Sequence, residues 1–389
     1  MKKIKFITFA IVFLIIISCP LIAKASEEPT DSLSTEVYSY LKDLYTIRNN
    51  GFLDGTLYKL KPFYDTSQNY GAWSLDHEVR RVKYLIDWSN ERGIKFTSID
   101  SLINIKKITC TGDYLKVRAD EQYIFKYIYK DDSSPSTNEF GVNLYHTITL
   151  KKKNGSYVVY NDYYLDCFED GLKSYSEKIS DTPYEPSKDF SYEINIPCKD
   201  NKCIEKNGKY NRSKAVEYAD KYCGVPWGSN NPIKYNRKYK NFTGVGGNCT
   251  NYVSQCLGDS EGGGLKQGYG WHCIYKGYDG AETSTAWSNA DAFKNFLLYS
   301  GKGTLIKKGT FKELVSSTEK FLHGPISMLD FGDVISYDKG NDIDHNAIVT
   351  SFDSHGYPLI NSHTVDRYHV PFDLGWGDNN IKFLLIHIK

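Results

Sequence analysis

Four long β-rich runs follow one another within residues 103–164, and no other feature constrains the fold of this chain as strongly. They are separated by Thr111-Gly112-Asp113, by a polar stretch over residues 131–138 and by Lys153-Asn154-Gly155-Ser156. An Asn-Gly pair between two strands is a strong signal for a tight hairpin turn. We therefore expect an antiparallel meander whose strands are Ile103–Cys110, Tyr114–Lys130, Gly141–Lys152 and Tyr157–Tyr164.

Two segments with helical periodicity precede the meander. Apolar residues recur every three or four positions over residues 33–48, and the pattern returns over residues 79–88 before Gly93. Helices followed by a meander of long strands predict an α+β domain over residues 27–170. We expect its antiparallel sheet to be curved, with a shape like that of nuclear transport factor 2.

The remainder of the chain is long enough for a second domain, since the 389 residues exceed the usual size of one domain. Residues 171–209 are polar, contain three prolines and lack periodicity, which is typical of a linker. A helix is expected from Tyr210 to the stop signal at Gly224, and another over residues 286–299. We expect the second domain to span residues 210–389, with an antiparallel sheet packed on helices.

The first 25 residues have the pattern of an export signal. Lys2, Lys3 and Lys5 precede an apolar run over residues 6–17, and Ala23-Lys24-Ala25 offers a cleavage site. Cys19 offers an alternative, a lipid anchor. The apolar run is shorter than the roughly 20 residues that a membrane span needs. We expect a secreted or cell-wall-associated protein without a stable membrane span.

Composition excludes some partners. The chain carries 48 basic and 47 acidic residues, a net charge of +1, so no overall field favours nucleic acid. Nine cysteines are present, and removal of the signal leaves eight. Disulfides between Cys198 and Cys203 or between Cys110 and Cys167 are open alternatives. Because no Cys-x2-Cys pair occurs, we expect neither a metal ion nor another cofactor.

One cysteine stands where a helix should start. Cys249 follows Gly246-Gly247-Asn248, and Tyr252, Val253, Cys256 and Leu257 form an apolar stripe after it. At a helix N-terminus the unpaired backbone N–H groups and the helix dipole favour a thiolate. The same groups can stabilise an oxyanion that forms on an attacked carbonyl. Cys249 is therefore the candidate nucleophile, whereas Cys256 fits a buried core position.

His345 is the candidate general base. It follows Asp342-Ile343-Asp344 and begins the apolar run Ala347-Ile348-Val349, which places its ring at the start of a strand. An imidazole that titrates near neutrality can take the proton of a thiol and return it to a leaving amine. We expect the ring to face a cleft.

A third polar group should orient this imidazole. The next strand is expected over residues 359–363, after the turn Asp353-Ser354-His355-Gly356, and its two-residue period places Asn361 and His363 on one face. If this strand pairs antiparallel with the strand of His345, either side chain can contact the ring. We prefer Asn361, because an amide carbonyl accepts the imidazole N–H without adding charge.

These motifs together resemble a known family. The helix opened by Tyr210-Asn211-Arg212, the run from Gly246 to Leu257, and the segments around His345 and residues 360–364 are similar to the "putative amidase" domain of Gram-positive secreted proteins. That family is related in pattern to the NlpC/P60 and CHAP cysteine peptidases, which share a papain-like core. The resemblance implies Cys249 as nucleophile, His345 as base, and Asn361 or His363 as the third member.

The activity implied by the resemblance is hydrolysis of an amide in cell-wall peptide material, through a thioester. The expected partner is peptidoglycan or a peptide. The family pattern commonly has aspartate before the cysteine, where this chain has Asn248, a residue that can still cap the helix. The rival hypothesis is a cell-wall binding protein that keeps the fold without turnover.

Overall fold

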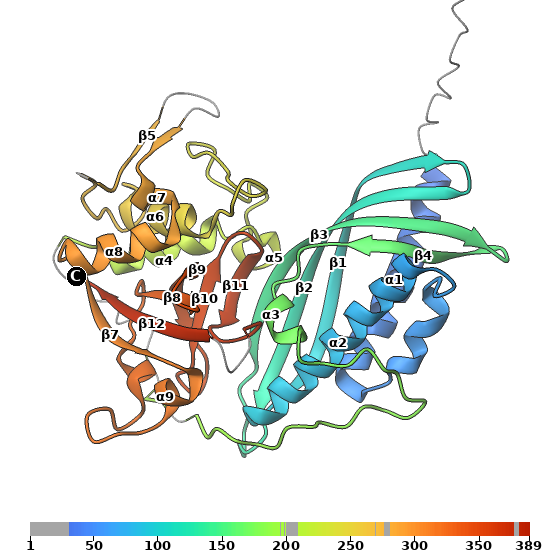
Figure 1. Ribbon diagram of the computed structural model, residues 1–389, viewed down its shortest axis with the longest axis horizontal. Helices are drawn as coiled ribbons and strands as arrows, with labels where there is room; N and C mark the ends of the chain where they lie inside the picture. The colour runs from blue at the N-terminus through green and yellow to red at the C-terminus, as the bar shows by residue number, and fades with distance from the viewer. Residues whose placement is uncertain are drawn as a thin grey trace, which may run out of the picture.

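The computed structural model describes residues 31–389, with the exception of 195, 198, 200–208, 269, 276–280 and 377–380. The export signal, Cys19, Cys198 and Cys203 therefore lie outside the described residues. Figure 1 shows two groups of helices and strands that lie side by side along the longest axis of the molecule. The architecture is mixed α+β, with a large antiparallel sheet, as expected.

The first part of the chain confirms the predicted order of two helices and a meander. The third strand-to-strand turn is the one that the sequence marks most clearly, and Asn154 and Gly155 there both have positive φ, at 52° and 82°. Gln68 begins the second helix by accepting a hydrogen bond from the backbone N–H of Tyr70. The elements are α1 (Asp31–Asp54), η1 (Leu57–Phe63), α2 (Asn69–Glu91), β1 (Ile94–Thr111), β2 (Tyr114–Tyr129), β3 (Asn138–Lys153), β4 (Ser156–Tyr163) and α3 (Glu169–Leu172).

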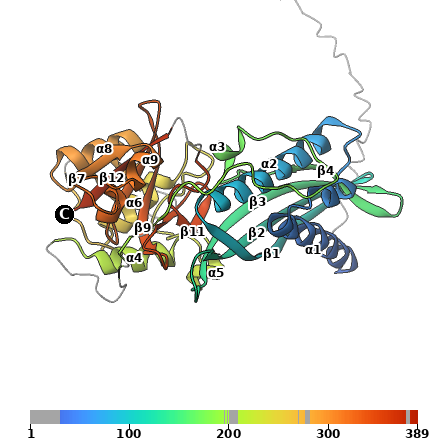
Figure 2. The ribbon, with the colours of Figure 1, turned by 90° about the horizontal axis from the view of Figure 1, so that it is seen from below.

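The segment after α3 has no helix or strand within its described residues 173–194, as expected of a linker. It nevertheless packs against the rest of the molecule. Ile194 and Ile196 are buried, and the backbone N–H of Ile196 donates to the carbonyl oxygen of His355. Figures 1 and 2 show it passing along the strands and helices of both groups.

The second part of the chain carries short helices and then strands. A single helix was expected over residues 286–299, but the structure has two, because the side chain of Asn289 accepts a hydrogen bond from the N–H of Ala292 and begins a new helix. The helices are α4 (Arg212–Lys221), α5 (Pro226–Ser229), α6 (Cys249–Gly258), α7 (Thr285–Ser288), α8 (Ala290–Tyr299), α9 (Phe311–Val315) and η3 (Pro325–Met328). The strands are β5 (Cys273–Tyr275), β6 (Ala281–Thr283), β7 (Gly303–Gly309), β8 (Val334–Lys339), β9 (Ile343–Phe352), β10 (Pro358–Ser362), β11 (Asp366–Pro371) and β12 (Ile381–Ile388).

A single antiparallel sheet runs through both groups. Its order is β1-β2-β3-β11-β10-β9-β8-β12-β7, and β4 also pairs with β3. The two halves of the sheet meet at β3, which pairs with β11 near its start and with β4 near its end. The pairing of β3 with β11 was not predicted from the sequence, because the two strands lie more than 200 residues apart.

Two hydrophobic cores cover the two faces of the sheet in its C-terminal half. One face contacts α4, α6 and α8 through a cluster that includes Tyr252, Val253 and Ile348. The other face packs against a second cluster, which includes Tyr337, Ala347 and Trp376. The same cluster forms the core of the N-terminal half. Within the described residues, every helix is too short or too polar to cross a lipid bilayer.

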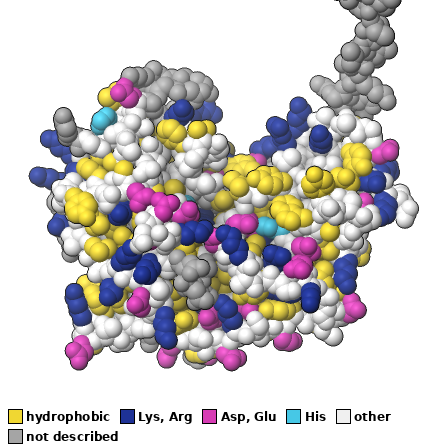
Figure 3. All heavy atoms as spheres, in the orientation of Figure 1, with side chains coloured by type: hydrophobic (Ala, Val, Ile, Leu, Met, Phe, Trp, Pro, Cys, Tyr) yellow, Lys and Arg dark blue, Asp and Glu magenta, His cyan; other side chains and the backbone are white. Residues whose placement is uncertain are grey.

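The described cysteines are free thiols. Cys110 and Cys167 are unpaired in the structure, so the disulfide left open between them is not formed. Cys256 is fully buried in the core beneath α6, as the sequence predicts. The face of the molecule in Figure 3 carries lysine, arginine and acidic side chains intermixed, in agreement with the balanced composition.

Candidate active site

Cys249 is the first residue of α6, as the sequence predicts. The two glycines before it have positive φ, 96° for Gly246 and 99° for Gly247, a conformation that residues with a Cβ rarely adopt. The thiol is largely buried, with 8% of the residue exposed, and its Sγ lies 3.7 Å from Oγ1 of Thr250. The first turn of the helix thus holds the thiol beside the unpaired N–H groups of the helix N-terminus.

The side chain of Asn248 does not cap α6, which corrects one expectation. Its Oδ1 accepts hydrogen bonds from the N–H of Phe242 at 3.1 Å and from Nδ2 of Asn251 at 2.8 Å. Its Nδ2 donates to Nδ1 of His363 at 2.9 Å. The side-chain amide of Asn248 is therefore hydrogen-bonded to the preceding loop, to Asn251 and to a buried histidine, and it does not cap the helix.

Thr250, which follows Cys249, is hydrogen-bonded to Asn346, which follows His345. Nδ2 of Asn346 donates to Oγ1 of Thr250 at 3.0 Å, and Oδ1 of Asn346 accepts from the hydroxyl of Ser336. All three side chains are almost completely buried. This polar contact fixes the first turn of α6 against β9, so the strand of His345 lies directly beneath the helix of Cys249.

His345 itself points away from α6. Successive side chains of a strand face opposite sides of the sheet, and Asn346 faces the helix. The ring of His345 lies 5.5 Å from the rings of Tyr337 and Trp376, measured between centroids, on the other face. Its Nε2 is buried and has no hydrogen-bond partner among the described residues. Burial, together with the charge of Arg367, lowers the pKa of His345 well below its usual value.

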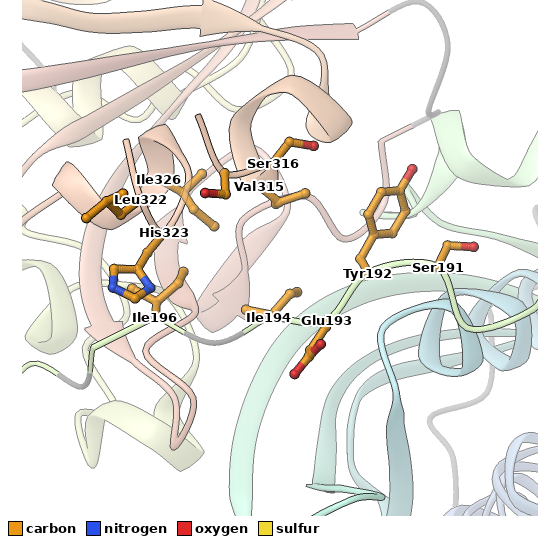
Figure 4. A pocket seen from close by; sticks show the side chains of 11 residues that line it. Ser191, Tyr192, Glu193, Ile194, Ile196, Val315, Ser316, Leu322, His323 and Ile326 are labelled. Atoms are coloured by element: carbon orange, nitrogen blue, oxygen red, sulfur yellow. The ribbon is translucent and has the colours of Figure 1, made fainter. Parts of the chain in front are cut away.

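The ring does line a cavity, as expected. This cavity of ≈180 Å³ lies between the two groups of elements and is bordered by Thr364, Arg367 and Trp376 on one side. The segment Asp166–Asp170 of the first part of the chain forms the opposite side. A larger pocket of ≈440 Å³ beside the linker, between Ile194 and His323, is lined by neither Cys249 nor His345 (Figure 4).

Asn361 lies on β10, which pairs antiparallel with β9 as predicted. Its side chain faces α4 and not the ring of His345. Nδ2 donates to Oδ1 of Asp220 at 2.8 Å, while Oδ1 accepts from the hydroxyl of Thr350 and from the N–H of His369. The amide is thus fully hydrogen-bonded to other groups.

His363 follows the end of β10 and faces the same side as Asn361. Its Nε2 donates to the carbonyl oxygen of Tyr222 at 2.7 Å, and its ring stacks on Tyr252 with centroids 3.8 Å apart. Since Nδ1 accepts from Asn248, this ring is held as the neutral imidazole. Burial lowers the pKa of His363 to about 3.

The structure therefore brings together some of the predicted residues and separates others. Cys249, Asn361 and His363 lie on the α6 face of the sheet, and His345 lies on the other. No hydrogen bond joins Cys249 to His345 among the described residues. Asn346 and Arg367 were not predicted as site residues. Asn346 directly follows His345 and precedes the apolar run of β9, which was the available signal, whereas nothing in the sequence marks Arg367.

The aromatic residues of the segment after α6 serve packing. Trp271 and Trp287 are fully buried, and Nε1 of Trp287 donates to Oδ1 of Asn251. Both tryptophans belong to the hydrophobic core on the α6 side of the sheet.

Comparison with protein families supports the resemblance seen in the sequence. Residues 209–386 match the family model described as "Putative amidase domain". The match includes Cys249, His345, Asn361 and His363, and it excludes the first part of the chain. An amidase hydrolyses amide bonds, so the description of this family names that class of reaction.

The "Uncharacterized protein YhbB" of Bacillus subtilis (strain 168) is 32% identical to this chain over 188 residues. The alignment covers 46% of this chain and 50% of that protein, so the chain spans about half the length of the curated relative it matches. Among solved structures, the intermembrane space region of the chloroplast protein ARC6 aligns with 36% of this chain and 98% of its own length. Its TM-score of 0.24, at 11% sequence identity, is too low to establish a shared fold.

Proposed function

We propose that residues 209–386 form a cysteine hydrolase that cleaves amide bonds, with Cys249 as the nucleophile and His345 as the base. The observation that carries this proposal is the hydrogen bond between Asn346 and Thr250, which holds the helix of the thiol on the strand of the imidazole. A thiol at a helix N-terminus with a histidine on the adjacent strand is the arrangement found in papain-like hydrolases. We include that fold class in the proposal.

The reaction follows from the groups present. His345 takes the proton of the Cys249 thiol, and the thiolate attacks the carbonyl carbon of the amide. N–H groups of the first turn of α6 stabilise the oxyanion, and the C–N bond then breaks as the amine leaves with the proton from His345. Water next hydrolyses the thioester and regenerates the thiol. His345 lies on the opposite face of β9 from α6, so this proton transfer requires its ring to leave the position beside Trp376. Nε2 of His345 has no hydrogen-bond partner among the described residues, so no hydrogen bond at that atom opposes the movement.

We further propose that the protein is exported and acts on peptides of the cell wall. The basic residues, apolar run and Ala-x-Ala site of the first 25 residues support export. The net charge of the chain, +1, suits a peptide substrate better than nucleic acid. In this proposal Asn361 or His363 is the third member of the site. Both residues support it from the face of the sheet that packs against α6.

Two measurements test the mechanism. Purified protein is incubated with peptidoglycan peptides, and the products are identified by mass spectrometry. We expect new fragments from the wild type, none from Cys249→Ala, and unchanged fragments from Cys256→Ala, a thiol of the same helix that is fully buried. Iodoacetamide should label Cys249 faster than the other thiols. Equal and slow labelling of all thiols would contradict an activated nucleophile.

One observation favours the rival function, a binding protein without turnover. The thiol of Cys249 and the ring of His345 lie on opposite faces of β9 and form no hydrogen bond among the described residues. If the protein only binds, Cys249→Ser should sediment with isolated cell walls as strongly as the wild type, and neither protein should release fragments. Fragment release by the wild type alone would exclude this rival.

A further inference from the structure

The cavity beside His345 contains a buried guanidinium that has no counter-ion among the described residues. Arg367 is 95% buried, since 5% of its surface is exposed. Its Nη2 donates to the carbonyl oxygen of Cys167 at 2.6 Å, whereas Nε and Nη1 have no hydrogen-bond partner. Among the described residues, no carboxylate lies within ion-pair distance of this side chain. A buried cation without an anion is strongly unfavourable, so an arginine in this state is typical of a site whose anion comes from a ligand.

Two more buried nitrogen atoms around the same cavity lack partners. They are Nε1 of Trp376 and Nε2 of His345. The guanidinium carbon of Arg367 lies 5.6 Å from the ring centroid of Trp376, and the ring of His345 lies 5.5 Å from that ring. All three side chains line the cavity of ≈180 Å³ and are more than nine-tenths buried. Unsatisfied buried donors are rare in proteins, and the three at this cavity, Nε and Nη1 of Arg367 and Nε1 of Trp376, indicate a missing acceptor.

The acidic residues of the cavity are engaged elsewhere or exposed. Asp166 lies 3.1 Å from Nε of Arg81 and 3.0 Å from Nε2 of His77. Asp170 accepts from Nζ of Lys339 at 2.6 Å. Glu169 and Asp344 are exposed and so lie toward the opening. The interior is therefore positive and the opening negative, which suits a ligand that directs one carboxylate inward and disfavours a ligand with several negative charges.

We propose that this cavity binds a single carboxylate group, and that the amide substrate is a peptide or acylated amino acid with a free carboxylate next to the bond that is cut. The second half of the proposal rests on the proposed hydrolase function, whereas the carboxylate site does not. Arginine binds a carboxylate through two parallel N–H···O bonds. Nη2 of Arg367 has a second N–H besides the one bound to Cys167, and it can form such a pair with Nε or with Nη1. The cavity is smaller than the ≈300–1,000 Å³ of sites for drug-sized ligands, so it admits one residue of the substrate.

The proposal gives roles to two features that the hydrolase mechanism leaves unexplained. A bound carboxylate offsets the positive charge of Arg367, which is one cause of the lowered pKa of His345. The substrate would thus make His345 a better proton acceptor when it binds. The first part of the chain also gains a role, because Cys167 and Asp170 form one wall of the subsite.

Isothermal titration calorimetry on the full chain tests the site. The probes are N-acetylglycine and its neutral counterpart N-acetylglycinamide. We expect the acid to bind at least tenfold more tightly than the amide, and Arg367→Met to abolish this preference. Cys249→Ala should bind as the wild type does, and Arg118→Met, the loss of an exposed arginine, serves as the matched control. Thermal unfolding should show that the acid stabilises the wild type and not Arg367→Met.

The outcomes separate the two proposals. Equal binding of acid and amide, or unchanged preference in Arg367→Met, would overturn the carboxylate site. If Arg367→Met does not fold, Arg367→Lys, which keeps the charge but loses the paired N–H groups, should still weaken binding of the acid. Binding of the acid by a chain that hydrolyses no peptide would overturn the hydrolase function alone. Hydrolysis at equal rates of acid- and amide-terminated peptides would overturn the substrate assignment alone.

Discussion

Nδ2 of Asn346 donates a hydrogen bond of 3.0 Å to Oγ1 of Thr250, which joins β9 to the first turn of α6. Each partner is the immediate neighbour of a proposed catalytic residue, His345 in one case and Cys249 in the other. Both side chains are buried, so water cannot replace the contact. This polar pair, together with the apolar packing of α6, holds the thiol above the sheet.

Replacing Thr250 by valine should therefore lower both stability and activity. Valine has nearly the same shape but offers no acceptor, so Nδ2 of Asn346 remains buried without a partner, at a cost of about 1–3 kcal/mol. Urea unfolding measures the loss, and peptide hydrolysis should fall because the first turn of α6 is less firmly held. Thr147→Val, on an exposed position of β3, is the control and should change stability by less than about 0.5 kcal/mol. An equal effect of the two substitutions would contradict this account.

Asn248→Asp should raise the pKa of His363. A carboxylate can only accept, so Nδ1 of His363 must carry a proton to keep the 2.9 Å contact, and Nε2 already donates to Tyr222. In the wild type the folded pKa of about 3 is below the unfolded value, so the unfolded state binds more protons between about pH 6.5 and pH 3. Stability should fall as the pH is lowered through that range.

The aspartate variant should lose less stability on acidification, since its folded state also binds the proton. Unfolding in urea at pH 7 and pH 4.5 measures the difference, and the nuclear magnetic resonance signals of the imidazole report its pKa directly. His363→Gln is the control, because it removes the titrating group. A steeper loss of stability in Asn248→Asp than in the wild type would exclude the proposed hydrogen-bond pattern.

His146 should make stability depend on pH in the opposite direction. This buried ring lies between Asp162, 3.0 Å from Nδ1, and Glu121, 3.2 Å from Nε2. Although burial opposes the charge, the two carboxylates raise the pKa of His146 to about 9. Its folded pKa is above the unfolded value, so its contribution is complete below about pH 6.5 and is lost as the pH rises through about 9. The wild type should lose roughly 3 kcal/mol more than His146→Gln between pH 6 and pH 9.5 in urea unfolding. Parallel curves for both proteins would contradict the ion pairing.

Gly224→Ala should destabilise the protein much more than Gly244→Ala. Both glycines have nearly the same positive φ, 86° and 85°, so both variants carry a similar backbone strain of roughly 1–2 kcal/mol. A Cβ at Gly224 would overlap the carboxylate of Asp366, whereas nothing lies within 4 Å of a Cβ at Gly244. Thermal unfolding of the two variants isolates the steric contribution. Equal melting temperatures would show that Asp366, the first residue of β11, can move away from the new Cβ without loss of stability.

Local patterns were sufficient to predict most of the elements. The turn at Asn154-Gly155 and the apolar spacing in α1 and α2 depend only on neighbouring residues, and the structure agrees with them. The break at Asn289 was missed, because the capping amide competes with an otherwise continuous helical pattern. The join between β3 and β11 was also missed, because strand pairing across more than 200 residues leaves no local signal.

The position of Cys249 at a helix start and of His345 near a strand start follows from local sequence, since the glycines, the helical stripe and the strand period act over a few residues. Which side chains meet depends on tertiary packing. A strand alternates its side chains, so whether His345 or Asn346 faces α6 depends on how β9 is packed between two cores. In the same way, Arg367 is a buried cation without a carboxylate partner among the described residues only because β11, Trp376 and Cys167 are brought together from distant parts of the chain.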